Sequence, residues 1–273
     1  MTRQALFDFI LRQRSFLCVG LDPDPDRLPH PLRGRPDGIT VFNREIIAAT
    51  KDLCVAYKPN LAFYEARGLQ GWRELEQTRS LLPDSHFSIA DAKRGDIGNT
   101  ATQYARAFFG NLDFDAITVA PYMGEDSVAP FLDFAGKWVI LLALTSNPGS
   151  RDFQLSPQED GLPLYAKVLR TAARWGSPDN LMFVTGATHP EKFAVIREWV
   201  PEHFLLVPGI GAQGGDLAAV CEHGRNPQVG LLVNASRDIL YAGDGPDFAD
   251  KAREAALRIQ QRMAYLLPPP QRS

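Results

Sequence analysis

Eight short apolar segments, separated by helix-like segments along the whole chain, most constrain the fold of this 273-residue sequence. Each is apolar almost continuously rather than at alternate positions, which predicts strands buried on both faces and hence a parallel sheet. Alternation sustained over this length favours a closed (β/α)8 TIM barrel over an open doubly wound sheet. The predicted strands are residues 16–22, 54–60, 87–93, 116–120, 138–144, 181–184, 204–207 and 229–233.

Between most of these strands the apolar residues recur at helical spacing, which predicts helices there. We expect an extra helix within residues 1–14, a single barrel domain over residues 1–273, and a flexible proline-rich tail from residue 267. Prolines exclude regular structure from residue 23 to Gly38. Asn99 or Thr100 is expected to cap the predicted helix of residues 101–109, the fourth helix of the chain. The predicted helices after that extra one are residues 39–53, 71–82, 101–109, 127–134, 163–175, 190–199 and 247–266, with one more before the last strand.

Composition excludes several classes of protein. The formal net charge is -3 and 45% of residues are hydrophobic, which argues against a nucleic-acid coat or a membrane-surface protein. No apolar run reaches membrane-spanning length, and the N-terminus lacks a signal-peptide core. Cys18, Cys54 and Cys221 lie in or beside apolar runs without metal-ligand spacing, so we expect free buried thiols in a reducing cytoplasm. The five histidines are scattered, and no metal site is predicted.

Charged residues follow the predicted strands, and the densest group is Asp91, Lys93 and Asp96. On an extended backbone Asp91 and Lys93 point to the same face. Two charges there must be paired with each other or with a ligand, because burying a lone charge is costly. A structural ion pair is the alternative. In a barrel, however, the carboxyl ends of the strands face a common site, and polar residues recur at those ends at Asp22, Lys58, Ser146 and Arg237.

Three loops after strands carry further signals. The loop after the seventh strand is rich in glycine, and Gln213 lies within it. Together with Arg237 after the eighth strand, it predicts a phosphate site, with a tight turn that needs glycine as the alternative. The polar loop of residues 145–161 has the length and composition of a mobile lid. The glycines that favour phosphate binding are Gly209, Gly211, Gly214 and Gly215.

With these residues the sequence resembles the orotidine 5′-phosphate decarboxylase family. Residues 91–100 resemble its Asp-x-Lys-x-x-Asp signature, which sugar-phosphate enzymes of the same superfamily share. Lys58 before Pro59 and Asn60, and Ser146 before Asn147, Pro148 and Gly149, narrow the resemblance to the decarboxylase. The likeness extends over almost the whole chain, through residues 20–22, 207–210, 213–214 and 234–237, and residues 122–127 resemble the longer bacterial subgroup.

The resemblance implies decarboxylation of orotidine 5′-monophosphate to uridine 5′-monophosphate in pyrimidine synthesis, with no cofactor and no metal. It also implies a cytoplasmic homodimer with its sites at the subunit interface. By that likeness Lys58, Asp91 and Lys93 form a charged network at the reacting carbon. Lys93 would be the proton donor, and Asp96 would come from the partner subunit.

The same likeness assigns the residues that hold the substrate. Asp22 and Thr100 would hold the ribose, with Thr100 again from the partner subunit, and Ser146 would contact the pyrimidine. Gln213 and Arg237 would grip the phosphate. Arg237 follows Ala235 and Ser236, where many members have Val-Gly. Ile97 and Pro208 complete the set, and Tyr241 is either a further phosphate contact or a packed aromatic residue.

Three rival functions stay open on the residues alone. One is a magnesium-dependent sugar-phosphate decarboxylase or aldolase of the same superfamily. Another is an aldolase that forms a Schiff base on Lys58 or Lys93. The third is a nucleotide-phosphate sensor without catalysis, against which the intact set of Asp91, Lys93 and Asp96 argues.

Overall fold

Eight parallel strands close into a barrel in chain order in the computed structural model, which describes residues 1–210 and 215–269. The predicted TIM barrel is therefore confirmed, and the open doubly wound sheet is wrong. The strands are buried along almost all their length, as their continuous apolarity predicted. They are β1 (Leu17–Leu21), β2 (Ala56–Pro59), β3 (Phe87–Arg94), β4 (Ala116–Val119), β5 (Trp138–Leu144), β6 (Leu181–Thr185), β7 (Leu205–Pro208) and β8 (Leu231–Ala235).

The extra N-terminal helix is present as α1 (Arg3–Gln13). No helix within the described residues combines the length and apolarity needed to cross a membrane. The other α-helices are α2 (Gly38–Thr50), α3 (Leu61–Glu65), α4 (Gly68–Leu81), α5 (Gly98–Ala105), α6 (Ala129–Leu132), α7 (Ser150–Phe153), α8 (Leu164–Ala172), α9 (Lys192–Trp199), α10 (Leu217–Gly224), α11 (Arg237–Leu240) and α12 (Phe248–Leu266).

Several predicted boundaries are wrong for local reasons. The eighth strand begins at Leu231 rather than at residue 229, because Val229 and Gly230 have φ angles of 65° and 66°. The proline-rich stretch after β1 is not wholly irregular, since it contains the 3-10 turns η1 (Pro25–Arg27) and η2 (His30–Leu32). A third 3-10 turn, η4 (Glu125–Ser127), precedes α6.

The predicted cap of the fourth helix is also wrong. Helix α5 begins at Gly98 after Ile97, so Asn99 and Thr100 lie within its first turn. Asn99 there accepts a hydrogen bond from Gln103 Nε2 at 3.3 Å instead of capping the helix. The helix continues directly into a π-helical turn, η3 (Arg106–Asn111).

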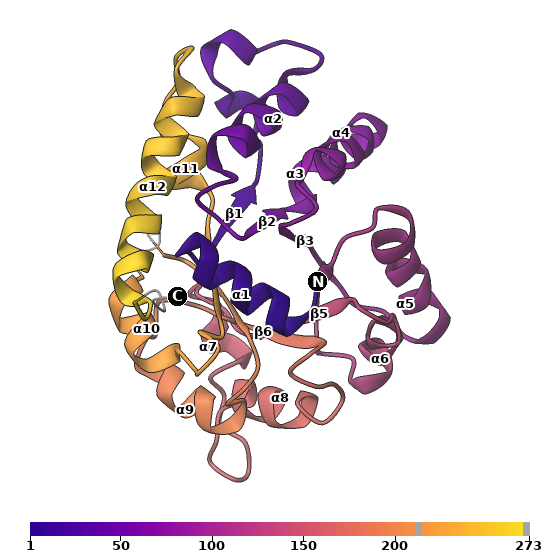
Figure 1. The fold of residues 1–273 in the computed structure, drawn as a ribbon. Helices are drawn as coiled ribbons and strands as arrows, with labels where there is room; N and C mark the ends of the chain where they lie inside the picture. The colour runs from indigo at the N-terminus through magenta and orange to yellow at the C-terminus, as the bar shows by residue number, and fades with distance from the viewer. Residues whose placement is uncertain (211–214, 270–273) are drawn as a thin grey trace. The chain divides into compact units, whose positions relative to one another are not determined.

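The chain forms two compact units, which are described separately below. The expectation of a single domain over residues 1–273 stays a prediction. One unit comprises Asp8–Ala92 and Asn234–Ser273. Within it α12 packs against α2 and α11, and α11 lies beside α12 in Figure 1. Phe42 of α2 stacks on Tyr241 and Phe248 at centroid distances of 6.1 and 5.6 Å, which joins the carboxyl-terminal helices to the core of this unit.

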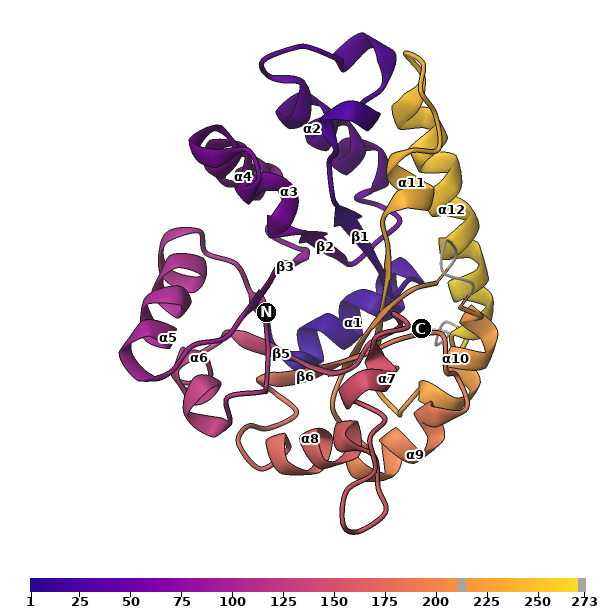
Figure 2. The same ribbon diagram turned by 180° about the vertical axis from the view of Figure 1, so that it is seen from behind.

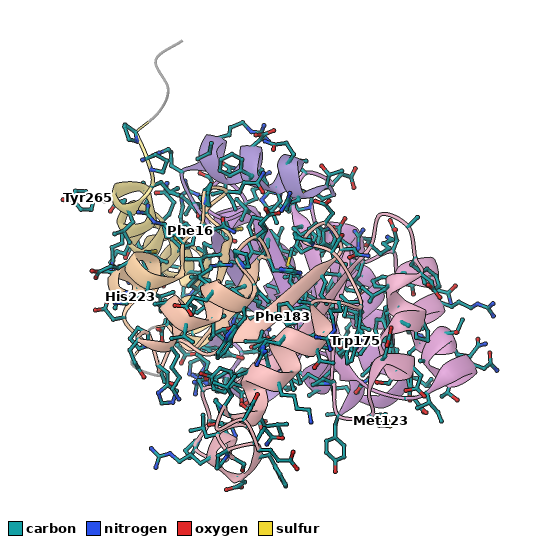
Figure 3. The ribbon with its side chains drawn as sticks, turned by 90° about the horizontal axis from the view of Figure 1, so that it is seen from below. Phe16, Met123, Trp175, Phe183, His223 and Tyr265 are labelled. Atoms are coloured by element: carbon teal, nitrogen blue, oxygen red, sulfur yellow. The ribbon has the colours of Figure 1, made fainter. Side chains whose placement is uncertain are left out.

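The other unit comprises Met1–Phe7 and Lys93–Val233. Strands β4 to β7 form a continuous parallel ladder in it. Helix α8 packs against α9, and α5 packs against α6, as Figure 2 shows. Phe183 of β6 is fully buried and lies among the side chains of the interior in Figure 3. The described part of the tail ends at residue 269, so the predicted flexible tail lies mostly outside the described residues.

Candidate active site

A buried ion pair links the carboxyl-terminal halves of two neighbouring strands. Lys58 is the third residue of β2, and its Nζ lies 2.6 Å from Asp91 Oδ2 of β3. Both side chains are less than one-tenth exposed. The strands hold this register locally, because Asn60 after Lys58 forms a parallel bridge with Asp91. The two charges therefore satisfy each other in a low-dielectric setting, where an unpaired one would be costly.

The charge of Lys58 depends on the carboxylates around it. Burial alone would lower the pKa of Lys58, but Asp91 and Asp22 act in the opposite direction and raise it well above its ordinary value. Lys58 therefore stays protonated at neutral pH. Burial also raises the pKa of the Cys18 thiol in the neighbouring strand β1. All three cysteines are buried and free, as expected.

Asp22 follows the last residue of β1 and is half-buried. Its Oδ1 atom is buried and has no hydrogen-bond partner within the described part of the chain. A buried carboxylate oxygen without a donor is unfavourable unless a ligand supplies one. This observation fits the predicted role of Asp22 in binding a hydroxyl group.

Lys93 is exposed, and its backbone has a φ angle of 48°. The expectation that Asp91 and Lys93 share a face assumed an extended backbone at both residues. That assumption is wrong at Lys93. The Lys93 main-chain N–H donates to Thr118 Oγ1 of β4 at 2.8 Å, which holds this left-handed position. A non-glycine residue with a left-handed backbone is strained by roughly 1–3 kcal/mol, and such residues concentrate at functional sites.

The predicted residues after β3 lie on a short turn before α5. Asp96 Oδ1 accepts a hydrogen bond from the Ile97 main-chain N–H at 2.8 Å. Ile97 is an apolar residue that is 53% exposed, and Thr100 is exposed in the first turn of α5. One segment thus carries a half-buried carboxylate together with an exposed apolar side chain and an exposed hydroxyl.

Ser146 begins the predicted lid, directly after β5 and Thr145. A Cβ atom at Gly186, after β6, would lie 2.7 Å from the Ser146 main-chain nitrogen, so only glycine lets the loop pack there. Gln154 holds the same loop, because its Oε1 accepts from the Thr145 N–H at 2.7 Å. The loop is more ordered than predicted, since residues 150–153 form α7.

The glycine-rich loop is described only at its two ends. Pro208 closes β7, and its carbonyl accepts a hydrogen bond from the Ala187 N–H at 3.0 Å. Gly209 has a φ angle of 98°, a conformation that glycine adopts readily. A Cβ atom at Gly215 would lie 2.7 Å from the Gly209 carbonyl oxygen. The predicted phosphate ligand Gln213, with Gly211 and Gly214, lies outside the described residues.

Arg237 is exposed at the first position of α11. Ser236 before it lies so close to β1 that a Cβ atom at Gly20 would collide with its Oγ atom. Asn234 Nδ2 donates to the same hydroxyl at 3.3 Å. The Ala-Ser-Arg sequence that departs from the resemblance is therefore accommodated by a glycine in the neighbouring strand.

Within each unit, then, the structure brings together some of the predicted residues. Asp22, Lys58 and Asp91 interact electrostatically in one unit. In the other, the sequence analysis missed Thr118, which holds Lys93, and Gly186, which makes room for Ser146. Thr118 lies within the apolar run of β4, where nothing in the sequence marks it. Gly186 directly follows β6, and a glycine at the end of a strand is a signal that could have found it. Among the described residues no group of three or more His, Cys, Asp or Glu has the arrangement of a metal site.

Comparison with known proteins identifies the family. Residues 15–252 match the model of the family described as "Orotidine 5'-phosphate decarboxylase / HUMPS family". The chain belongs to this family. It is 55% identical over 270 residues to an orotidine 5′-phosphate decarboxylase of Bacteroides fragilis, with 98% of both chains covered. A second such relative, from Flavobacterium johnsoniae, is 56% identical over 270 residues, again covering 98% of both.

A solved structure supports the family assignment. The structure of Leishmania donovani OMP decarboxylase superposes with a TM-score of 0.81 at 36% identity and covers 96% of this chain and 100% of that one. The resemblance drawn from the sequence motifs is therefore confirmed at the level of the family. The predicted site residues, from Asp22 to Arg237, all fall within the matched residues 15–252.

Proposed function

We propose that this chain catalyses the decarboxylation of orotidine 5′-monophosphate to uridine 5′-monophosphate and carbon dioxide, without a cofactor, in pyrimidine synthesis. The observation that carries the proposal is the buried ion pair of Lys58 and Asp91 at 2.6 Å. Asp91 precedes Lys93 by two residues in β3. Family membership and the names of relatives at about 55% identity support it.

Lys93 is the proposed proton donor. Loss of carbon dioxide from a ring carbon leaves an electron pair and a carbanion-like centre on that carbon. A cationic ammonium group stabilises this developing charge and then transfers its proton to the carbon, which forms the new C–H bond. The exposed position of Lys93 and its anchored, left-handed backbone suit a group that must meet a substrate in one orientation.

Asp91 and Lys58 have supporting roles in this proposal. Asp91 favours the protonated form of a neighbouring lysine and fixes its position. Lys58, whose own pKa is raised by Asp91 and Asp22 against the effect of burial, pairs with the buried carboxylate of Asp91 at 2.6 Å. Asp96 of the partner subunit completes the charged network.

The remaining predicted residues bind the non-reacting parts of the substrate. Asp22 and Thr100 of the partner subunit would hold the ribose, and Ser146 would contact the pyrimidine, next to Ile97 and Pro208. Gln213 and Arg237 would bind the phosphate. Binding energy from the phosphate, which lies far from the reacting carbon, can be used to close the lid over the substrate.

Two further parts of the proposal concern the state of the protein. We propose that it acts as a homodimer, because the segment that carries Asp96 also exposes Thr100 and the apolar side chain of Ile97. A cytoplasmic location fits its three free buried cysteines. Sedimentation of the purified protein, with a mixed-mutant complementation assay between Lys93→Ala and Asp96→Ala, tests the shared site: activity regained on mixing supports it.

The first experiment is an ultraviolet assay. Purified protein is mixed with orotidine 5′-monophosphate, with and without a chelator, and the loss of the substrate absorbance is followed. We expect rapid loss that a chelator does not change. Loss of activity with the chelator would indicate the magnesium-dependent rival, and no reaction at saturating substrate would contradict the proposed activity. Borohydride treatment with substrate should not trap a covalent adduct on Lys58 or Lys93.

A further inference from the structure

Two tyrosine hydroxyls contact the main chain on either side of Asp22. Tyr64 of α3 donates to the carbonyl oxygen of Leu21 at 3.2 Å. Tyr241, directly after α11, donates to the carbonyl oxygen of Asp22 at 2.9 Å. The Tyr241 hydroxyl also accepts from the Asp24 N–H at 2.8 Å. Three hydrogen bonds between these tyrosine hydroxyls and the main chain of Leu21, Asp22 and Asp24 thus hold the segment that carries the Asp22 carboxylate.

Regular structure does not hold this segment. Strand β1 ends at Leu21, and Pro23 follows Asp22 and has no N–H to donate. Main-chain groups at such a place need partners from side chains or water. The two tyrosines supply these partners, and removing either hydroxyl would free part of the segment.

Each tyrosine is itself fixed in place. Tyr64 is fully buried, and Asn43 Nδ2 donates to its hydroxyl at 2.9 Å. The ring of Tyr241 stacks on Phe42 at 6.1 Å, and the Arg27 guanidinium lies 3.9 Å from its centroid. A ring held by these contacts has little freedom to rotate, so its hydroxyl is a rigid support.

We propose that Tyr241, assisted by Tyr64, is a positioning residue that sets the Asp22 carboxylate for the ribose of the substrate. The Oδ1 atom of Asp22 is buried and lacks a donor among the described residues, so it is available to accept a hydrogen bond from a ribose hydroxyl. The geometry of that bond depends on where the main chain places Asp22. The inference rests on the proposed function, and it goes beyond the two earlier readings of Tyr241 as a phosphate contact or a merely packed ring.

Tyr241 also joins two parts of the substrate-binding set. Its main-chain N–H donates to the carbonyl oxygen of Arg237 at 3.1 Å, while its hydroxyl holds Asp22. One residue therefore connects the segment proposed to bind ribose with the segment proposed to bind phosphate. A substrate bound by both segments requires them to keep a fixed spacing.

The kinetic test compares Tyr241→Phe with Tyr265→Phe, a control whose side chain is 90% exposed on α12 and stands clear of the ribbon in Figure 3. We expect Tyr241→Phe to lower kcat/KM by about tenfold, as misplacement of a binding group does. The inhibition constants of uridine 5′-monophosphate and its 2′-deoxy and 3′-deoxy analogues should move closer together, because Asp22 no longer recognises a hydroxyl. An equal loss for all three nucleotides, or no loss, overturns the proposal.

A double-mutant cycle shows whether Tyr241 acts through Asp22. Asp22→Asn should cost much less in the Tyr241→Phe background than in the wild type, since coupled residues are not additive. Additive losses would mean that Tyr241 has a separate structural role.

We call the hydrogen bonds that join the Tyr241 hydroxyl to the main chain of Asp22 and Asp24 the clamp. Hydrogen exchange tests the clamp without relying on activity. The amide of Asp24 loses its acceptor in Tyr241→Phe, so exchange in a peptide covering residues 17–28 should become about tenfold faster, with no change in Tyr265→Phe. Unchanged exchange overturns the clamp even if the wild type is an active decarboxylase. Conversely, faster exchange with an inactive wild type supports the clamp and contradicts the proposed function.

Discussion

Lys58 and Arg197 are two cations shielded from solvent, and they differ in the groups that accept their hydrogen bonds. Lys58 contacts a carboxylate at 2.6 Å, and the carboxylates raise its pKa above the ordinary value. Arg197 of α9 donates instead to main-chain carbonyl oxygens, and burial lowers its pKa to about 9. Its four acceptors are the carbonyls of Gly224, Val200, His203 and Gly230, at 2.6 to 3.1 Å.

The difference indicates what each cation is for. Arg197 satisfies carbonyl groups of loops and strand beginnings, which is a structural role that five rigid donors suit well. Lys58 forms a charge pair that costs desolvation free energy and could be replaced by apolar residues if stability alone mattered. A buried cation among carboxylates at a strand end is therefore a functional candidate, whereas one among carbonyls is a structural element.

The largest effect that sharpens this comparison is expected at Lys93. Lys93→Ala should lower turnover by at least about 10³-fold, because it removes both a proton donor and the charge that stabilises the carbanion-like centre. Binding of uridine 5′-monophosphate, measured by calorimetry, should stay within about threefold. The matched control is Lys251→Ala on α12, where an exposed lysine pairs with Glu254 at 3.0 Å. A near-normal rate for Lys93→Ala would show that another group donates the proton.

Lys58→Met should lower kcat/KM by about 10²-fold while the protein still folds, because Asp91 loses the ammonium group that orients it. Methionine keeps most of the stem volume, so packing around β2 changes little. Steady-state kinetics and thermal unfolding of the same sample separate the two effects. If Lys58→Met loses stability and keeps its activity per folded molecule, Lys58 belongs with Arg197 as a structural cation.

Arg197→Met should give the reverse result. We expect the free energy of unfolding to fall by about 2–3 kcal/mol, because several carbonyl groups lose their donor. The folded fraction should keep the wild-type kcat, since Arg197 has no role in the proposed site. Urea unfolding measures the first quantity, and active-site titration with a tight nucleotide inhibitor normalises the second. A large drop in kcat per active site would remove the distinction between the two cations.

Much of this arrangement could be predicted from the sequence, because it depends on local apolarity. All eight strands follow continuous apolar runs, and Lys58 and Asp91 interrupt such runs near their ends. Burial of a charge within an apolar run requires a partner, and the parallel ladder brings the partner from the next strand.

Other features depend on contacts between residues distant in sequence and could not be predicted. The left-handed backbone of Lys93 is held by Thr118, whose role no spacing rule indicates. The hydrogen bonds of Tyr241 reach back to residues more than 200 positions earlier. Arg197 looks like an ordinary basic residue in the last turn of a helix, where a solvent-exposed charge is the usual expectation.

The smallest expected effect concerns His203, whose carbonyl is one of the acceptors of Arg197. Its side chain is 6% exposed, contacts Phe183, and has no hydrogen-bond partner for either ring nitrogen within the described part of the chain. Burial, followed by the nearby charge of Arg197, lowers the pKa of His203 from 6.5 to about 4. The unfolded chain therefore takes up a proton first as the pH falls. Stability is fully present above pH 6.5 and is lost progressively as the pH approaches 4.

We expect this titration to remove roughly 1–2 kcal/mol of unfolding free energy over that interval. His203→Gln should flatten the pH dependence of unfolding between pH 6.5 and 4 relative to the wild type. His223→Gln, at an exposed position of α10 that Figure 3 labels, is the matched control and should leave the dependence unchanged. If His203→Gln keeps the wild-type slope, other groups cause the acid sensitivity. The cluster around Arg197 would then hold its carbonyls without making the fold sensitive to protons.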